Sequence, residues 1–192
     1  TTPGGDALAE QGLLAAIEAA APGDNAPLRA HAQGELGALR ERQGRRQQAR
    51  SLTAAALLTA PLDAHQERYR WQWRLGRLAE ADGDLDAAIG AYRRAVAELA
   101  RVRHRLALVD AGGQSTYATV LEPLYLGLAD LLLRRADDLA PGSPAEQALL
   151  GERLEAANLA RVRTRMPTPA EFESIFAEQD RDDASLARSE LR

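Results

Sequence analysis

The sequence predicts an all-α protein, built of antiparallel helical hairpins that stack into a short solenoid. Hydrophobic residues make up 45% of the 192 residues but aromatic residues only 4%, and Ala, Leu and Arg dominate, as in packed helices. Apolar residues recur at helical spacings along most of the chain, and no stretch alternates with the period of a strand. The gaps between the helical stretches are mostly short, which favours antiparallel neighbours.

Pro, Gly and capping residues divide the chain into about eight expected helices. The first four are expected over residues 7–21 with Asp6 as N-cap, 27–43, 45–59, and from an Asp63 cap to the turn at 81–84. The fifth, over 85–109, has one continuous apolar stripe and should be longer than its neighbours. The sixth is expected over 117–137, kinked by Pro123.

Two capping boxes follow, each with proline at the first helical position, and they open the seventh and eighth helices. They run over residues 143–146 and 168–171. Residues 1–178 are therefore expected to form one helical domain. Residues 179–192 are polar and acidic, as in a frayed tail or a linker.

The helical hairpins repeat with a period of about 34 residues, which is typical of the tetratricopeptide repeat. In residues 69–102 the matching positions are Leu75-Gly76, Gly83, Ala88, Tyr92 and Ala95. Residues 30–63 fit the same frame through Leu36-Gly37, Gly44, Ala49, Ala56 and Pro61, although Thr53 stands where an aromatic side chain is expected. A third copy begins at Leu126-Gly127, but an expanded turn at 141–144 removes its second helix from register. An ordinary antiparallel bundle, which also needs small residues where helices cross, is the alternative.

The first helix of each such hairpin faces a concave groove that usually contacts the ligand. The exposed groove positions then include Arg70, Trp73, Arg77 and Glu80, preceded by His31 and Glu41 in the earlier hairpin, with Gly34 and Ala38 between them. Trp73 between two arginines on one helical face could anchor an extended peptide. Packing of Trp73 against the next hairpin is an equally good interpretation.

In the degenerate third hairpin the same positions form a leucine row that cannot remain wet. Its members are Leu121, Leu124, Leu128, Leu131 and Leu132. We expect the eighth helix, with Phe172, Ile175 and Phe176, to cover most of this row, and a downstream domain to dock beside it.

Composition excludes several kinds of chemistry. The chain has no cysteine, so it has no thiolate nucleophile or ligand, and all 24 of its basic residues are arginine, so no lysine can form a Schiff base. The three histidines, His31, His65 and His104, lack the spacing of metal ligands, and adjacent acids such as Asp137-Asp138 and Asp182-Asp183 point to different sides of a helix. We therefore expect no metal, no cofactor and no catalysis by this chain.

The expected partner is a protein or peptide. A net charge of −4 does not favour nucleic acid, and the arginine clusters at 93–94, 101–105 and 161–165 have no interleaved aromatic residues. No apolar run is long enough to span a membrane, and residues 1–6 lack a signal-peptide pattern, so we expect a cytoplasmic location without membrane contact.

Two blocks carry a family resemblance. The run from Tyr69-Arg-Trp-Gln-Trp-Arg-Leu-Gly76 to Val96, and the block Glu122-Pro-Leu-Tyr-Leu-Gly-Leu-Ala-Asp-Leu-Leu-Leu133, resemble the region that precedes the peptidase in bacterial CHAT-domain proteins. Glu171-Phe172 and Phe176 fall where that family has its last helix before the peptidase, although Met166-Pro-Thr-Pro169 departs from the pattern. The resemblance covers about residues 69–176.

In that family a caspase-like peptidase with a cysteine nucleophile and a histidine base follows the repeats, and neither residue can be placed in this chain. The resemblance therefore implies a non-catalytic regulatory and protein-interaction module, N-terminal to a cysteine peptidase domain. A free-standing tetratricopeptide adaptor and an RNA-binding regulator are the alternatives.

Overall fold

A computed structural model describes residues 3–20, 25–102 and 121–161 of the chain. The chain divides into two compact units, residues 1–160 and residues 161–192. The second unit lies outside the described residues except for Arg161, the last helical residue. The expected domain end at 178, the tail at 179–192 and the eighth helix all fall there.

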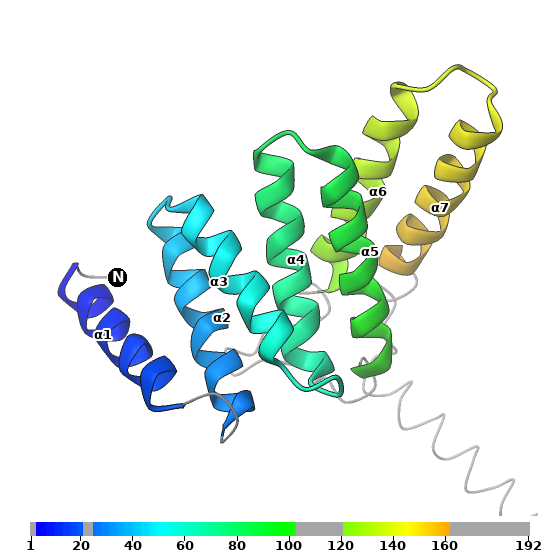
Figure 1. Cartoon of the computed structure of the whole chain (residues 1–192). Coiled ribbons are helices and arrows are strands. Elements are labelled where there is room, and N and C mark those ends of the chain that lie inside the picture. Colours follow the sequence, from blue (N-terminus) through cyan, green and yellow to red (C-terminus); the bar gives the residue numbers. More distant parts are fainter. Residues whose placement is uncertain (1–2, 21–24, 103–120, 162–192) are drawn as a thin grey trace, which may run out of the picture. The chain divides into compact units, whose positions relative to one another are not determined.

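The described part of the chain is all helical and contains no strand, which confirms the predicted all-α class. Its helices, labelled in Figure 1, are α1 (Pro3–Ala19), α2 (Ala26–Arg42), α3 (Arg46–Thr59), α4 (His65–Ala81), α5 (Leu85–Val102), α6 (Glu122–Asp137) and α7 (Pro144–Arg161). The expected continuation of α5 to 109 and the expected start of α6 at 117 lie outside the described ranges.

Glycine turns end three of the described helices, and a capping box begins another, close to where the sequence predicts. Gly44, Gly83 and Gly142 have φ of 72°, 80° and 76°, a left-handed conformation that L side chains rarely adopt, in the turns after α2, α4 and α6. The Ser143 hydroxyl accepts a hydrogen bond from the Glu146 amide at 3.2 Å, as expected of the first capping box. The Glu146 carboxylate in turn accepts from the Gly142 amide.

Two expectations about helix starts are wrong. Asp6 lies inside the first turn of α1 and is not its N-cap, because the helix begins earlier, at Pro3. Asp63 does not cap α4, since Ala64 holds that position and makes no side-chain cap. Pro123 lies in the first described turn of α6, and the expected kink depends on residues before 121, which lie outside the described ranges.

The hairpins α2–α3 and α4–α5 are closely packed, and a glycine marks each crossing. A Cβ at Gly37 would lie 2.7 Å from the Thr53 hydroxyl oxygen, and a Cβ at Gly76 would lie 2.4 Å from the Tyr92 ring. Each glycine therefore sets how closely the second helix approaches the first. Thr53 is fully buried although it is smaller than the expected aromatic residue.

The main hydrophobic core joins α4, α5, α6 and α7 around Tyr92, Leu99, Leu124 and Leu132. Helices α6 and α7 meet much less closely along their lengths than α2 with α3 or α4 with α5. This agrees with the expanded turn that the sequence shows at 141–144. A smaller cluster, made of Ala30, Ala56, Ala60 and Trp71, joins α2, α3 and α4.

An ion-pair group fastens α4 to α5. The His65 Nδ1 lies 2.6 Å, and the Arg68 Nε 3.0 Å, from the two carboxylate oxygens of Glu98. Burial acts to raise the pKa of Glu98, but the hydrogen bonds from Arg68 and His65 outweigh it, so the pKa lies below its ordinary value of 4.5. The folded state therefore favours the ionised carboxylate.

Candidate interaction surface

The predicted groove lies on α2 and α4, whose side chains meet directly. The Arg74 guanidinium donates a hydrogen bond to the Gly34 carbonyl oxygen at 2.7 Å, across the two helices. Arg77 donates to both carboxylate oxygens of Glu41, at 3.1 and 3.2 Å, and Arg74 lies 3.2 Å from the same carboxylate. The Arg74 side chain is only 11% exposed, and this burial lowers its pKa.

Trp73 takes part in the core rather than standing free. It packs, half-buried, against the main core, and its buried indole nitrogen has no partner at hydrogen-bonding geometry. The Arg77 guanidinium lies over the indole, 5.1 Å from its centroid. Burial raises the pKa of the neighbouring Tyr92 phenol. The packing interpretation of Trp73 thus fits the structure, while its ring and Arg77 form one stacked unit.

The remaining groove residues differ in whether their side chains are already paired or are exposed to solvent. Glu80 on α4 is paired with Arg134 on α6 at 2.8 Å. Arg70 is exposed; its Nε donates to the Tyr69 hydroxyl at 3.2 Å, and its guanidinium lies over the Tyr69 ring. His31 is exposed. The structure therefore brings Trp73, Arg77 and Glu41 together in a group whose charges pair with each other. Arg70 and His31 remain exposed to solvent.

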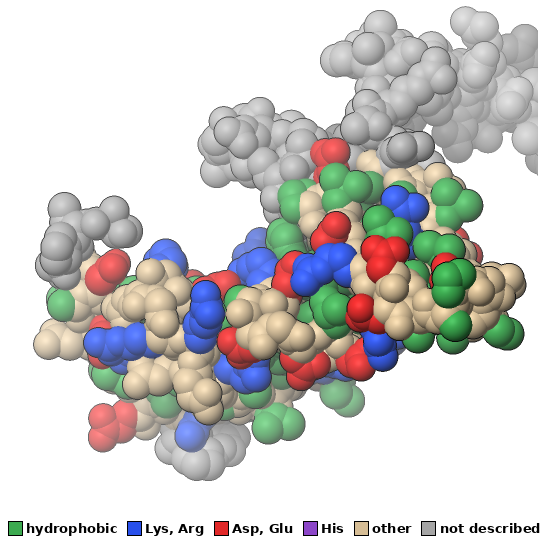
Figure 2. Space-filling view, turned by 90° about the horizontal axis from the view of Figure 1, so that it is seen from above, with side chains coloured by type: hydrophobic (Ala, Val, Ile, Leu, Met, Phe, Trp, Pro, Cys, Tyr) green, Lys and Arg blue, Asp and Glu red, His purple; other side chains and the backbone are tan. Residues whose placement is uncertain are grey.

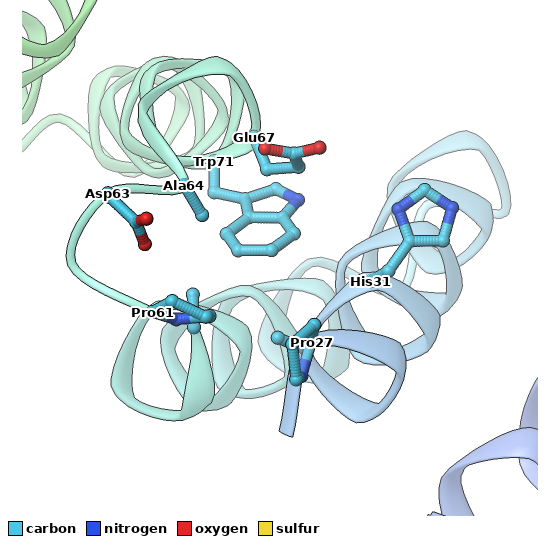
Figure 3. Close-up of a pocket in the computed structure, with 9 residues that line it drawn as sticks. Pro27, His31, Pro61, Asp63, Ala64, Glu67 and Trp71 are labelled. Carbon is cyan, nitrogen blue, oxygen red and sulfur yellow. The ribbon is translucent and has the colours of Figure 1, made fainter. Parts of the chain in front are cut away.

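His31 borders a pocket that sequence reasoning did not identify. The pocket has a volume of about 200 Å³ and lies between the start of α2, the end of α3 and the start of α4 (Figure 3). It is lined by Pro27, Ala30, His31, Ala60, Pro61, Asp63, Ala64, Glu67 and Trp71. Asp63 and Glu67, rather than the predicted Arg70 and Trp73, share the pocket with His31.

A glycine inside α2 was the available signal for this pocket. A Cβ at Gly34 would lie 2.2 Å from the Trp71 indole nitrogen, so Trp71 can reach α2 only because Gly34 has no side chain. Trp71 comes from α4 and packs on Ala30 and Ala56 of the preceding hairpin. The α2–α3 hairpin thus receives an aromatic side chain from the next helix, at a place other than the Thr53 position.

The predicted leucine row is buried, as expected. Leu121, Leu124, Leu128, Leu131 and Leu132 are at most 5% exposed and belong to the main core. In the described unit they share this core with α5 and with Ala156 and Ala160 of α7. The row is therefore a core face of α6 and not a continuation of an open groove. Phe172, Ile175 and Phe176 lie outside the described residues, so their predicted docking is untested.

The arginine clusters are partly committed to internal contacts. Arg93 on α5 donates to the Glu152 carboxylate on α7 at 2.7 Å, and Arg94 donates to the Gln72 amide oxygen at 3.0 Å. Figure 2 shows acidic and basic side chains interspersed over one face of the described unit. Side chains from 103–105 and 161–165, with His104, fall outside the description.

Two further findings concern the described residues alone. No three of their His, Cys, Asp and Glu side chains are grouped so that they could hold a metal ion. None of the helices there combines the length and the apolar character needed to cross a membrane.

Comparison with known proteins adds no identification. No protein-family model matches the chain, and no curated protein matches its sequence.

Proposed function

We propose that this chain is a protein-interaction and regulatory module built from tetratricopeptide-like hairpins, and that it is the non-catalytic part N-terminal to a CHAT-type caspase-like peptidase. The repeat interpretation is supported by equivalent contacts in successive hairpins, Gly37 with Thr53 and Gly76 with Tyr92. The link to a peptidase depends on the sequence resemblance of residues 69–96 and 122–133. The chain contains no cysteine, so the nucleophile would come from outside it.

The observation that carries the interaction role is the composite face of α2 and α4. The Arg74–Gly34 and Arg77–Glu41 contacts join the two helices into one surface, so a ligand would contact both hairpins at once. The surface also carries the exposed Arg70 side chain and the pocket beside His31. A face with a fixed framework and a few open polar groups suits recognition of an extended peptide.

The sequence of the reading frame beyond Arg192 tests the peptidase link. A following domain with a His and Cys pair would support it, and catalytic activity should then require that domain. A reading frame that ends near Arg192 would contradict the link and leave a free-standing adaptor.

Binding of the labelled 192-residue chain to an array of extended peptides tests the interaction role. Arg70→Glu should change the affinity of the strongest interactions at least fivefold, because it reverses an exposed charge on this face. The matched control is Arg101→Glu, the same charge change at an exposed position on α5. Equal effects of the two variants, or no binding to any peptide, would contradict the proposal.

A further inference from the structure

We propose that the pocket beside Trp71 binds a basic side chain, arginine above all, from an extended segment of a partner protein. The inference depends on the proposed interaction role only for the source of that side chain. The pocket itself is defined by its size, its unpaired carboxylates and its indole, each of which is visible in the described unit.

The size of the pocket suits one side chain. Its volume of about 200 Å³ is below the roughly 300–1,000 Å³ of sites that enclose whole small molecules. Its walls are the small apolar residues Pro27, Ala30, Ala60, Pro61 and Ala64, and Trp71, only 4% exposed, closes one side. Such walls can pack against the methylene groups of a long basic side chain while its charged end reaches polar groups.

Two carboxylates give the pocket its charge preference. Asp63 and Glu67 form no ion pair with any described residue, whereas Glu10, Glu41 and Glu98 are each held by an arginine. Arg70, one turn beyond Glu67, is close enough to be influenced by this carboxylate but makes no ion pair with it. Glu67 is also half-buried, so a cation in the pocket would gain a partly desolvated partner.

The Trp71 indole is a second and independent recognition element. The residue lines the pocket and is only 4% exposed, so its ring is held in place; its N–H is a donor that can serve a carbonyl oxygen of the bound segment but not the guanidinium. Figure 3 shows the ring nitrogen on the side of Glu67 and His31. A planar guanidinium can stack on an indole and pair with a carboxylate in two contacts, which an ammonium cannot do equally well. This favours arginine over lysine.

An exposed leucine between two lining residues favours a protein segment as the ligand. Leu62 lies between Pro61 and Asp63 in the chain and is 82% exposed. We expect it to contact an apolar neighbour of the inserted arginine. A free cationic metabolite would not use this contact.

Nuclear magnetic resonance of the full chain can detect filling of the pocket. The protein has two tryptophans and therefore two indole N–H resonances, which a Trp73→Phe variant assigns. N-acetyl-arginine amide should shift the Trp71 resonance saturably. N-acetyl-citrulline amide, which has nearly the same shape and no charge, should bind at least fivefold more weakly. An equal response to both probes would overturn the proposal.

Variants that remove one negative charge test whether Glu67 contributes to the affinity for the arginine probe. Glu67→Gln should weaken the arginine probe roughly five- to tenfold, as expected for loss of a partly buried charged contact. Asp137→Asn, which removes the same charge from an exposed position on α6, is the matched control and should leave affinity unchanged. Equal affinities of the Glu67→Gln variant and the unmodified chain would refute the role of Glu67 and the proposal with it.

A peptide distinguishes a protein segment from a free metabolite. Acetyl-Leu-Arg-Leu amide should bind more tightly than the single-residue probe, and Leu62→Ser should remove at least part of that gain. No gain would overturn the assignment to a protein segment. Failure of the arginine probe, while other peptides bind through Arg70, would refute the pocket and leave the interaction role standing.

Discussion

Tyr92 is clamped between two glycines, and this clamp makes a sharp prediction about Gly76→Ala. The ring edge with Cδ2 and Cε2 faces Gly76 on α4, and the side with Cε1 faces Gly127 on α6. Added Cβ atoms would lie 2.4 and 2.7 Å from the ring at these two positions. Because Tyr92 is only 4% exposed, the ring cannot retreat from one helix without meeting the other. We therefore expect Gly76→Ala to push α4 and α5 apart.

Two opposing effects set the magnitude. Replacing glycine by alanine in the middle of a helix contributes about 0.5–1 kcal/mol of stability through backbone entropy. Overpacking a buried contact costs about 1–3 kcal/mol. Gly76→Ala should therefore lower the free energy of unfolding by roughly 1–2 kcal/mol. In a unit of this size each kcal/mol lowers Tm by about 2–4 °C.

Urea and thermal unfolding followed by circular dichroism would measure the change. Gly90→Ala is the matched control in α5, because its Cβ would meet only the flexible end of Arg94, at 3.4 Å. This variant should be stabilised by about 0.5–1 kcal/mol. A Gly76→Ala protein as stable as Gly90→Ala would refute the clamp. In a Tyr92→Leu background the penalty at Gly76 should largely disappear, which separates ring contact from any other cause.

Three further predictions concern buried groups. Leu128→Glu should lower the unfolding free energy by roughly 3 kcal/mol or more, because it buries an unpaired charge. The control is Leu126→Glu on the same helix, where Leu126 is 47% exposed and the change should be about 0.5 kcal/mol or less. Similar urea midpoints for the two variants would disprove the assigned core face. The pKa of Glu98 is lowered in the folded state, so the ion pairs of Glu98 stabilise the fold above its ordinary pKa of 4.5. This stabilisation is lost as pH falls through the pKa of the folded state. Glu98→Gln should therefore reduce the loss of stability at acid pH, measured as unfolding free energy against pH. Thr53→Val should raise the unfolding free energy by roughly 1 kcal/mol, since the Thr53 hydroxyl is buried without a hydrogen-bond partner; a loss of stability would show that this oxygen is satisfied.

Local chemistry made the helix ends predictable. Left-handed backbone at Gly44, Gly83 and Gly142 requires glycine, and Ser143 satisfies an amide that its own helix cannot. Such signals depend on a few neighbouring residues and can be read directly. The starts of α1 and α4 were missed by a few residues, because several acceptable first residues lie close together there.

Contacts between helices were harder to predict, because they depend on crossing geometry. The frame placed Arg77 and Glu41 on one face but could not show that they pair, since long side chains choose partners from the next helix. The same limit hid the pocket. The repeat pattern directed attention to Thr53 and Trp73, while Trp71 filled the space above Gly34. A glycine within a helix, away from any turn, was the local sign of that approach.

Internal pairing explains why recognition should occur at the end of the α2–α4 face and not at its centre. A ligand at the centre would have to break the Arg77–Glu41 pair, and one carrying a new charge there would compete with contacts already formed. At the pocket, the Glu67 carboxylate makes no ion pair with a described residue, so a bound arginine can pair with it without disrupting an existing pair. The central pairs then fix the spacing of α2 and α4, and this spacing determines the width of the pocket. Loss of the central pair in Glu41→Gln should therefore weaken arginine binding less than Glu67→Gln does, and the reverse order would place recognition at the centre.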